Sequence, residues 1–301
     1  MPNELNIGLV GLDTSHVIAF TNLLNNPDAD YHVAGGRITT AFAGGSDDFE
    51  LSRSRVAGFT AQLRDEHGVQ IVDSPQAVAE HCDAILLTSV DGRVHREQFS
   101  KIAAYGKPTF IDKPFAITSA DAREIAALAR TGSTPLMSCS SLRYAQPLVD
   151  ALADTGNGAI IGADCFGPMS IEPTQPGLFW YGIHTVEMLI AIMGPHCCEV
   201  RAATSEDHDV ISGLWNDGRI GTVRGNRKGN GRFGCTLHHP QTVRLVDTSE
   251  HPKPPYAGLM ERVLKMFNGG DPDVGLEETV HIIRFIEAAN ESRETGCAVA
   301  L

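Results

Sequence analysis

The sequence predicts an α/β protein in which a doubly wound parallel sheet precedes an α+β domain with an open, mostly antiparallel sheet. The first half alternates apolar strand-like runs with helical segments of about 10–15 residues, which is typical of βαβ units. The second half consists mainly of short strand-like pieces with turn residues between them. A chain of 301 residues is long enough for about two domains. We predict domains at residues 1–141 and 142–301, with the last helix a candidate to pack back on the first domain.

Start and stop signals define the elements of the first half. Ser74 with Pro75 marks the N-terminus of one helix, and Thr118 with Asp121 resembles a capping box at another. Gly68 and Gly106 end the helices that precede them. The predicted strands are 5–12, 37–45, 69–74, 83–89, 108–114 and 134–140.

The second half opens with strand character and then changes pattern. A Pro/Gly-rich loop leads into an amphipathic helix that ends at Gly194, and a second helix covers 275–296 with Val280, Ile283, Phe285 and Ile286 on its apolar side. The predicted strands are 158–168, 198–204, 209–215, 218–225, 233–239 and 241–247.

Composition excludes several classes of function. The 24 basic and 37 acidic residues give a net charge of −13, and such a surface repels nucleic-acid backbones and anionic lipid. No apolar run reaches the roughly 18 residues that a membrane span needs, and the start of the chain lacks the basic segment of a signal peptide. Seven scattered cysteines are typical of reduced thiols, so we expect a cytoplasmic protein. The one local cluster, His196 with Cys197 and Cys198, is a poor chelator, and we predict no metal site.

Polar residues follow the predicted parallel strands, where ligands of such sheets bind. Lys113 ends an apolar strand before Pro114, and partial burial there would lower its pKa and suit it to proton transfer. His184 lies in a helix with Glu187 three residues later, so a carboxylate could orient its ring for general acid/base work. The alternatives are a solvated lysine at a turn and a histidine with a purely structural role.

Taken together, these segments resemble the glucose-fructose oxidoreductase/inositol dehydrogenase/MocA (Gfo/Idh/MocA) family over nearly the full length. The resemblance rests on the order and spacing of "IGLVGLDTSH", of "VDGRVH" ending at His95, of "DKP" at 112–114 and of "GIHTVE" at 182–187. "GRIGTVRG" and "IEAANESRETG" are also similar to this family. It implies an NAD(P)-dependent oxidoreductase that acts on a hydroxylated carbon of a sugar, cyclitol or derivative.

The resemblance also implies residue roles. Lys113 and His184 would flank the reacting carbon and carry the proton transfer. Arg143, Trp180 and Tyr181 are further candidate substrate contacts, although Arg143 and Tyr181 are equally consistent with structural roles. Trp180 replaces the acidic residue that the family has four positions before the histidine, so that proton acceptor is missing. The candidate cofactor contacts are Gly11, Asp13, Thr14, Ser15, His16, Asp47, Thr88, Ser89, His95, Asp112 and Lys113.

The first turn, "GLDTSH", departs from the G-x-G-x-x-G fingerprint of dinucleotide-binding folds. Asp13 and His16 stand where the second and third glycines belong. A carboxylate about 4 Å from a phosphate costs on the order of 4 kcal/mol at an effective dielectric near 20. Asp13 could instead turn inward and cap the helix, leaving Thr14, Ser15 and His16 to offer donors to a diphosphate. Otherwise the turn is a well-capped helix start that binds no phosphate.

The second strand end favours NAD without excluding NADP. Asp47 or Asp48 could accept a hydrogen bond from a ribose 2′-hydroxyl, whereas Arg53 could serve a 2′-phosphate. Two alternative functions are redox-neutral lyase, hydratase or isomerase chemistry at a degenerate cofactor site, and a non-catalytic sugar or nucleotide sensor. A small-molecule substrate and a homo-oligomer, dimer or tetramer, are expected from the resemblance.

Overall fold

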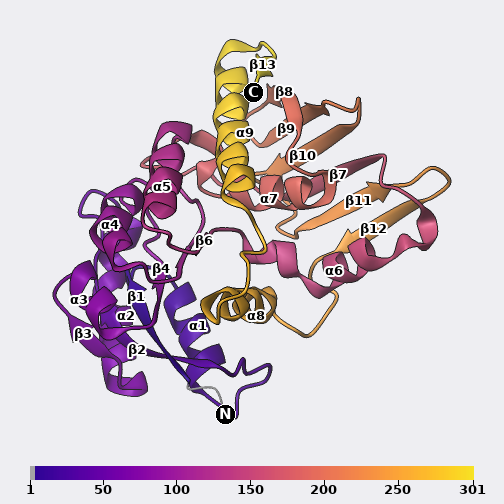
Figure 1. The fold of residues 1–301 in the computed structure, drawn as a ribbon. Helices are drawn as coiled ribbons and strands as arrows, with labels where there is room; N and C mark the ends of the chain where they lie inside the picture. The colour runs from indigo at the N-terminus through magenta and orange to yellow at the C-terminus, as the bar shows by residue number, and fades with distance from the viewer. Residues whose placement is uncertain (1–3) are drawn as a thin grey trace. The chain divides into compact units, whose positions relative to one another are not determined.

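The computed structural model describes residues 4–301 (Figure 1). The chain forms two compact units. The first contains the residues up to Cys139 together with Tyr256–Thr279, and the second contains Ser140–Pro255 with Val280–Leu301. The segment of the second half that joins the first unit is therefore mainly helix α8 (Pro255–Phe267).

The first unit is built on a parallel six-stranded sheet in the order β3-β2-β1-β4-β5-β6, which confirms the predicted doubly wound fold. The strand order reverses between β1 and β4, so their carboxyl ends form the switch point where ligands of such sheets bind. All four residues of β4 are buried, as expected for a strand covered on both faces. The strands are β1 (Leu5–Val10), β2 (Gly36–Phe42), β3 (Gln70–Val72), β4 (Ala84–Leu87), β5 (Thr109–Ile111) and β6 (Leu136–Met137).

The predicted end signals at Ser74, Thr118 and Gly68 lie at helix ends in the first unit, whereas α4 ends at Ile102 and a 3₁₀ turn, Ala103–Tyr105, separates it from Gly106. The Ser74 hydroxyl accepts from the Ala77 amide at 3.2 Å, and the Thr118 hydroxyl accepts from the Asp121 amide at 3.0 Å. Gly68 ends α2 in the left-handed region, at φ 66°. The helices are α1 (His16–Asn25), α2 (Glu50–His67), α3 (Pro75–His81), α4 (His95–Ile102) and α5 (Ser119–Thr131).

Helix α8 adds to the first unit beside α1 (Figure 1). The ring of Tyr256 packs edge-on against Phe20 of α1, with 5.6 Å between ring centroids. This helix is absent from the elements predicted above, although one of its faces is apolar and buried: Ala257, Leu259, Met260, Val263, Leu264, Met266 and Phe267.

The second unit contains a seven-stranded sheet in the order β12-β11-β7-β10-β9-β8-β13. Only β7 and β10 pair in parallel, and the other pairs are antiparallel, which confirms the predicted sheet. The strands are β7 (Gly162–Pro168), β8 (Cys197–Thr204), β9 (His208–Trp215), β10 (Ile220–Asn226), β11 (Gly234–His238), β12 (Val243–Asp247) and β13 (Val299–Ala300).

The two faces of this sheet differ. Gly213 and Gly221 lie where a Cβ would meet Phe285 of α9 (Leu276–Thr295) and Leu189 of α7 (Gly182–Met193), so these helices cover one face. Helix α6 (Gln146–Ala153) completes the unit. The strands also carry exposed apolar side chains that alternate with the buried ones: Val210, Leu214, Ile220, Val243 and Leu245.

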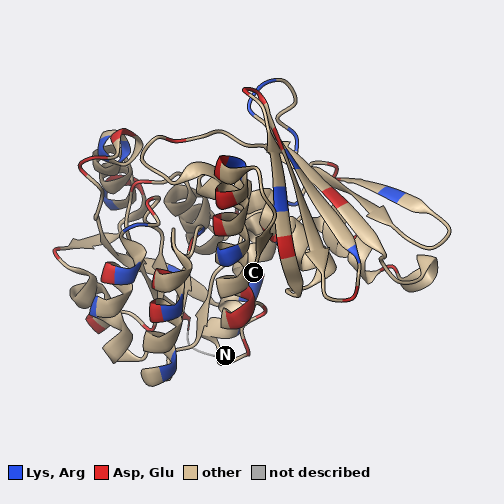
Figure 2. Cartoon of the chain, turned by 90° about the horizontal axis from the view of Figure 1, so that it is seen from above, with Lys and Arg blue, Asp and Glu red and all other residues tan. Residues whose placement is uncertain are grey.

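Charged residues of both signs are spread over the helices of the first unit, whereas the strands of the second sheet carry fewer of them (Figure 2). Within residues 4–301, no helix is long and apolar enough to cross a membrane. In the same range no group of three or more His, Cys, Asp or Glu side chains is placed to hold a metal ion. All seven cysteines are free thiols.

Candidate functional site

The turn after β1 still requires its first glycine. Gly11 has φ +93°, and a Cβ there would lie 2.5 Å from the Ser89 amide nitrogen. The Gly11 amide donates to the Phe42 carbonyl at 2.9 Å, and the Thr88 hydroxyl donates to the Gly11 carbonyl at 2.7 Å. The turn is therefore held between the ends of β2 and β4, at the switch point of the sheet.

Asp13 turns into the interior of the first unit, and it does not cap α1. The Ser52 hydroxyl donates to one carboxylate oxygen at 2.6 Å, and the Val90 amide donates to the other at 2.8 Å. The Ser52 oxygen in turn accepts from the Ser46 amide at 2.8 Å. Burial raises the pKa of Asp13, and the hydrogen bonds from Ser52 and Val90 partly oppose that effect. Asp13 thus links three loops at the carboxyl edge of the sheet.

The N-terminus of α1 has amide donors that its N-cap side chain does not satisfy. Ser15 is exposed at the N-cap position and makes no side-chain capping hydrogen bond. The Thr14 hydroxyl is buried and accepts a long hydrogen bond of 3.4 Å from the His16 amide. A helix N-terminus without a side-chain cap presents amide donors and a partial positive charge, which suit a phosphate group.

His16 and Asp112 form a hydrogen-bonded pair at the ends of β1 and β5. The His16 Nδ1 lies 2.5 Å from one Asp112 carboxylate oxygen, and the other oxygen accepts from the Lys113 amide at 2.9 Å. The His16 ring packs against Tyr256, with 4.9 Å between centroids. Burial alone would raise the pKa of Asp112, but the charge and hydrogen bond of His16, with a smaller effect of Lys113, lower it to about 2. Asp112 is therefore a buried, ionised carboxylate.

Lys113 follows Asp112 and precedes a cis peptide bond to Pro114. Desolvation lowers the pKa of its ammonium, and the charge of Asp112 opposes this shift. A lysine with a lowered pKa is better able to release and take up a proton near neutral pH. This agrees with the environment expected for Lys113 from its position at the strand end.

The loop after β2 is held by an ion-pair network. Arg93 forms a two-point contact with Asp48, at 2.8 and 2.9 Å, and also pairs with the buried Asp91 at 2.7 Å. The hydrogen bond from Arg93 lowers the pKa of Asp48. Arg53 pairs with Glu50 on the surface of α2. Of the two aspartates expected near a ribose, Asp48 is therefore committed to Arg93, and Asp47 is exposed.

His95 is fully buried and makes its contacts with backbone carbonyls. Its Nε2 lies 2.7 Å from the Ser89 carbonyl, and its Nδ1 lies 3.3 Å from the Phe115 carbonyl. The Ser89 hydroxyl donates to Gln98 at 2.8 Å. His95 thus contacts both the loop that follows β4 and the loop that follows β5, next to the predicted cofactor contact Ser89.

In the second unit, His184 lies in the first turn of α7 among aromatic rings. The ring centroids of Tyr181 and Phe233 lie 5.6 and 5.5 Å from that of His184, and Trp180 lies 6.2 Å from Tyr181. The His184 Nδ1 is 2.7 Å from the Ser140 hydroxyl. The structure thus places His184, Tyr181 and Trp180, three candidate substrate contacts, in one aromatic cluster.

Glu187 of α7 forms an ion pair with Arg143. Its carboxylate accepts from the Arg143 guanidinium at 3.0 and 3.3 Å, and both side chains are largely buried. Residues three apart on a helix diverge by about 60° around the axis, and here that separation directs Glu187 to the 3₁₀ turn that carries Arg143. Arg143, which we expected near a substrate, is held by this ion pair.

Four residues that contact the predicted site residues were not predicted from the sequence. Ser140 and Phe233 contact His184, Ser52 contacts Asp13, and Tyr256 contacts His16. The sequence near Ser140 could have indicated only its role in the turn, where its hydroxyl accepts a hydrogen bond from the Leu142 amide at 3.3 Å. Its contact with His184 spans 44 positions of the sequence and has no local signal.

Comparisons with known proteins agree with this geometry. Residues 51–138 match the family model described as "Oxidoreductase family, NAD-binding Rossmann fold" (GFO_IDH_MocA). No curated protein matches the chain.

Solved structures share the fold over nearly the whole chain. A probable dehydrogenase from Thermotoga maritima is 18% identical, with a TM-score of 0.79, and covers 98% of this chain and 99% of its own. GenD2 from gentamicin A biosynthesis, in complex with NAD, is 15% identical, with a TM-score of 0.79 and coverage of 99% and 97%. The myo-inositol dehydrogenase from Lactobacillus casei, in complex with NAD(H) and myo-inositol, is 14% identical, with a TM-score of 0.78 and coverage of 99% and 97%.

At these identities the solved structures establish the fold. The parallel sheet with its switch point and the mixed second sheet are the observed features of that fold. Residues 51–138 are therefore similar to the oxidoreductase family with an NAD-binding Rossmann fold, and the whole chain has the fold of these dehydrogenase structures.

Proposed function

We propose that the protein is an NAD(P)-dependent dehydrogenase that transfers hydride between nicotinamide and a hydroxylated carbon of a sugar, cyclitol or derivative. The observation that carries the proposal is the environment of Lys113. Desolvation lowers its pKa at the carboxyl edge of a parallel sheet, directly after a carboxylate that is bonded to His16. Such an ammonium is suited to hold a substrate hydroxyl and exchange a proton with it.

The residues of the first turn fit a dinucleotide. Gly11 keeps the close approach to Ser89 that this turn needs, and the Asp13 carboxylate is bonded to interior groups. The amides at the start of α1, the Ser15 hydroxyl and the His16 Nε2 would hold the diphosphate. Thr88, Ser89 and His95 would shape the adjacent wall, and Asp47 would accept from a ribose hydroxyl, which favours NAD. When bound, the nicotinamide supplies hydride transfer.

Proton transfer would rest on Lys113 and His184. Lys113 would bind the substrate oxygen through its Nζ, and His184 would take or return the hydroxyl proton at its Nε2. Trp180 and Tyr181 offer aromatic surface for the C–H face of a sugar or cyclitol ring. Arg143 was also predicted to contact the substrate, but its ion pair with Glu187 supports a structural role.

The Ser140 hydroxyl, unlike a carboxylate, can act as either donor or acceptor at the His184 Nδ1. A carboxylate at Nδ1 can only accept, which fixes the ring with its proton on Nδ1. A hydroxyl can donate to Nδ1 or accept from it, so Nε2 can carry a proton in one neutral tautomer and a lone pair in the other. This arrangement suits a residue that serves as base in one direction of a reversible oxidation and as acid in the other.

The enzyme would also self-associate and reside in the cytoplasm. The exposed apolar residues on the second sheet, such as Leu214, Ile220 and Leu245, support association of that sheet into a dimer or tetramer. The seven free thiols support a cytoplasmic location.

The first experiment is a titration of the purified protein with NADH and NADPH, following nicotinamide fluorescence, after a check for co-purified cofactor. We expect saturable binding with a preference for NADH, followed by turnover of sugars or cyclitols that Lys113→Ala or His184→Ala abolishes without unfolding. Absence of both binding and bound cofactor would refute the dehydrogenase proposal and favour redox-neutral chemistry or ligand sensing. Full activity in either variant would remove that residue from the mechanism.

A further inference from the structure

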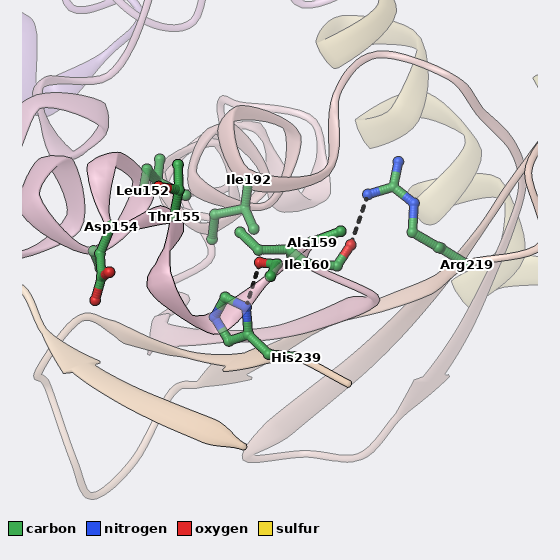
Figure 3. A pocket seen from close by; sticks show the side chains of 10 residues that line it. Leu152, Asp154, Thr155, Ala159, Ile160, Ile192, Arg219 and His239 are labelled. Atoms are coloured by element: carbon green, nitrogen blue, oxygen red, sulfur yellow. Dashed lines mark hydrogen bonds between the residues drawn. The ribbon is translucent and has the colours of Figure 1, made fainter. Parts of the chain in front are cut away.

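Two half-buried arginines of the chain are held by different kinds of partner. Arg219 lines a cavity of about 540 Å³ in the second unit (Figure 3) and pairs with Asp217. Its Nη2 also donates to the Met193 carbonyl at 2.8 Å, and its Nη1 contacts the Ile160 carbonyl at 3.4 Å. These backbone contacts give Arg219 a structural role. Arg93, in the first unit, donates its side-chain N–H groups to two carboxylates, whose place on a guanidinium another anion can take.

Arg93 lies where the loops that follow β2 and β4 meet. Both strands are neighbours of β1 in the sheet, so the ion pair between Arg93 and Asp48 connects the loops on either side of the Gly11 turn. In dinucleotide-binding folds, side chains near the end of the second strand meet the ribose 2′ position. A carboxylate there binds the 2′-hydroxyl of NAD, and an arginine binds the 2′-phosphate of NADP. This chain has one group of each kind there, and the two are bonded to each other.

The two carboxylates occupy different edges of the Arg93 guanidinium. The buried Asp91 accepts from Nε at 2.9 Å and from Nη2 at 2.7 Å, and it also accepts from the Arg93 backbone amide at 3.0 Å. Asp48, whose side chain is 70% exposed, accepts from Nη1 at 2.9 Å and from Nη2 at 2.8 Å. Asp91 therefore orients the guanidinium from the interior, whereas Asp48 covers the two N–H groups that face the loop after β2.

We propose that Asp48 makes the enzyme selective for NAD, because it occupies the edge of Arg93 that would otherwise bind the 2′-phosphate of NADP. This inference rests on the proposed dehydrogenase function. The paired Nη1 and Nη2 groups of an arginine fit carboxylate and phosphate oxygens alike. With Asp48 and Asp91 both on one guanidinium, the cluster has one net negative charge, which repels a phosphate. The 2′-hydroxyl of NAD is neutral and does not compete for Arg93.

The test compares NADH and NADPH binding, measured by nicotinamide fluorescence, in the wild type and Asp48→Ala. The substitution frees the two N–H groups of Arg93. We expect the affinity for NADPH to rise by about tenfold to a hundredfold, and the affinity for NADH to change by less than about threefold. Because the Asp48 side chain is largely exposed, the variant should fold. An NADPH affinity that stays at the wild-type value would overturn the proposal.

Glu50→Ala is the matched control. Glu50 is 73% exposed and pairs with Arg53 on α2, so this variant loses the same charge but frees the other arginine near the loop. We expect less than about a threefold change in NADPH affinity, as for the loss of one screened surface charge. A gain as large as that of Asp48→Ala would assign the 2′-phosphate to Arg53 or to net charge alone, and would overturn the proposal.

A second variant tests the guanidinium itself. Asp48→Ala combined with Arg93→Lys keeps a positive charge beside the buried Asp91 but lacks the paired N–H groups. We expect most of the NADPH gain of Asp48→Ala to be lost in this double variant. A gain that persists in full would show that Arg93 does not bind the 2′-phosphate.

Adenosine 2′,5′-bisphosphate and adenosine 5′-monophosphate distinguish this proposal from the dehydrogenase proposal, since they differ by the 2′-phosphate and contain no nicotinamide. In saturation-transfer NMR, we expect Asp48→Ala to bind the bisphosphate more tightly than the wild type does, and the monophosphate equally. That result without nicotinamide binding would refute the dehydrogenase function and support the role of Arg93. Nicotinamide binding with no gain for the bisphosphate would overturn the role of Asp48 alone.

Discussion

The carboxylate of Asp13, at the second glycine position of the first turn, accepts a hydrogen bond of 2.6 Å from Ser52 on α2. This contact and the bond from the Val90 amide direct the charge of Asp13 into the unit. The aspartate therefore links the turn to the loops that carry Ser52 and Val90.

The exchange Asp13→Gly restores the fingerprint glycine but removes this linkage. We expect the free energy of unfolding to fall by about 1–3 kcal/mol, because the Val90 amide and the Ser52 hydroxyl lose a buried acceptor. NADH binding should not become tighter. Denaturant unfolding and NADH fluorescence measure both quantities. Asp13→Asn is the matched control, since its amide can still accept from Val90 and should keep most of the stability. Tighter NADH binding in a stable Asp13→Gly protein would show that the carboxylate does oppose the phosphate.

Because the pKa of Asp112 is lowered in the folded protein, we expect protonation of this residue to lower the free energy of unfolding in acid. Its pKa is lowered from 3.8 to about 2, so its ionised form stabilises the folded state at any pH above the unfolded value. This contribution, about 2 kcal/mol, is lost as the pH falls from about 4 through about 2. The measurement is the free energy of unfolding as a function of pH for the wild type and Asp112→Asn, whose difference isolates this group. Parallel curves for the two proteins between pH 5 and 2 would contradict the assignment.

His16 should support cofactor binding although it occupies a glycine position. We expect His16→Gly to weaken NADH binding, by about tenfold if one charge-assisted hydrogen bond to a phosphate is lost. It also removes the imidazole partner of Asp112, so the pH dependence of the free energy of unfolding should change in the same variant. His16→Gln keeps a donor and should bind NADH better than His16→Gly. Improved binding in His16→Gly would instead mean that the imidazole obstructs the diphosphate.

Ser140 is expected to act on catalysis through His184. In Ser140→Ala the ring loses its Nδ1 partner, and we expect kcat to fall by about tenfold to a hundredfold with a changed pH profile, while KM changes little. Ser140→Thr keeps the hydroxyl and should restore part of the rate. Equal pH profiles in Ser140→Ala and wild type would assign Ser140 a purely structural role.

Glu187 is expected to matter for stability and only indirectly for catalysis. Glu187→Ala leaves the Arg143 guanidinium buried without its counter-charge, and we expect a loss of about 3–5 kcal/mol. Thermal and denaturant unfolding measure this loss. The double variant Glu187→Met with Arg143→Met should be less destabilised than Glu187→Ala, because no unpaired charge remains. A stable but inactive Glu187→Ala protein would return Glu187 to the role of orienting His184.

Local signals in the sequence predicted most of the fold correctly. The caps at Ser74 and Thr118 and the glycine at 68 act within one turn of the chain, and the apolar runs of the parallel strands need no distant partner to be recognised. Helix α8 was not predicted, although its regular apolar face is a local pattern. Its packing against α1 joins segments more than 200 residues apart, and no local pattern indicates that contact.

The sequence by itself predicted the two sheets and most of their elements, and it proposed Lys113 and His184 as the side chains most suited to chemistry. Only the tertiary structure decided where the other charges go. Asp13 is directed to Ser52, Glu187 to Arg143, and His16 to Asp112. Each of these polar groups is largely buried, so each must find a partner, and the available partners come from loops that the sheets bring together from distant parts of the chain. Hydrophobic periodicity is a local property, whereas the pairing of buried charges depends on the assembled fold.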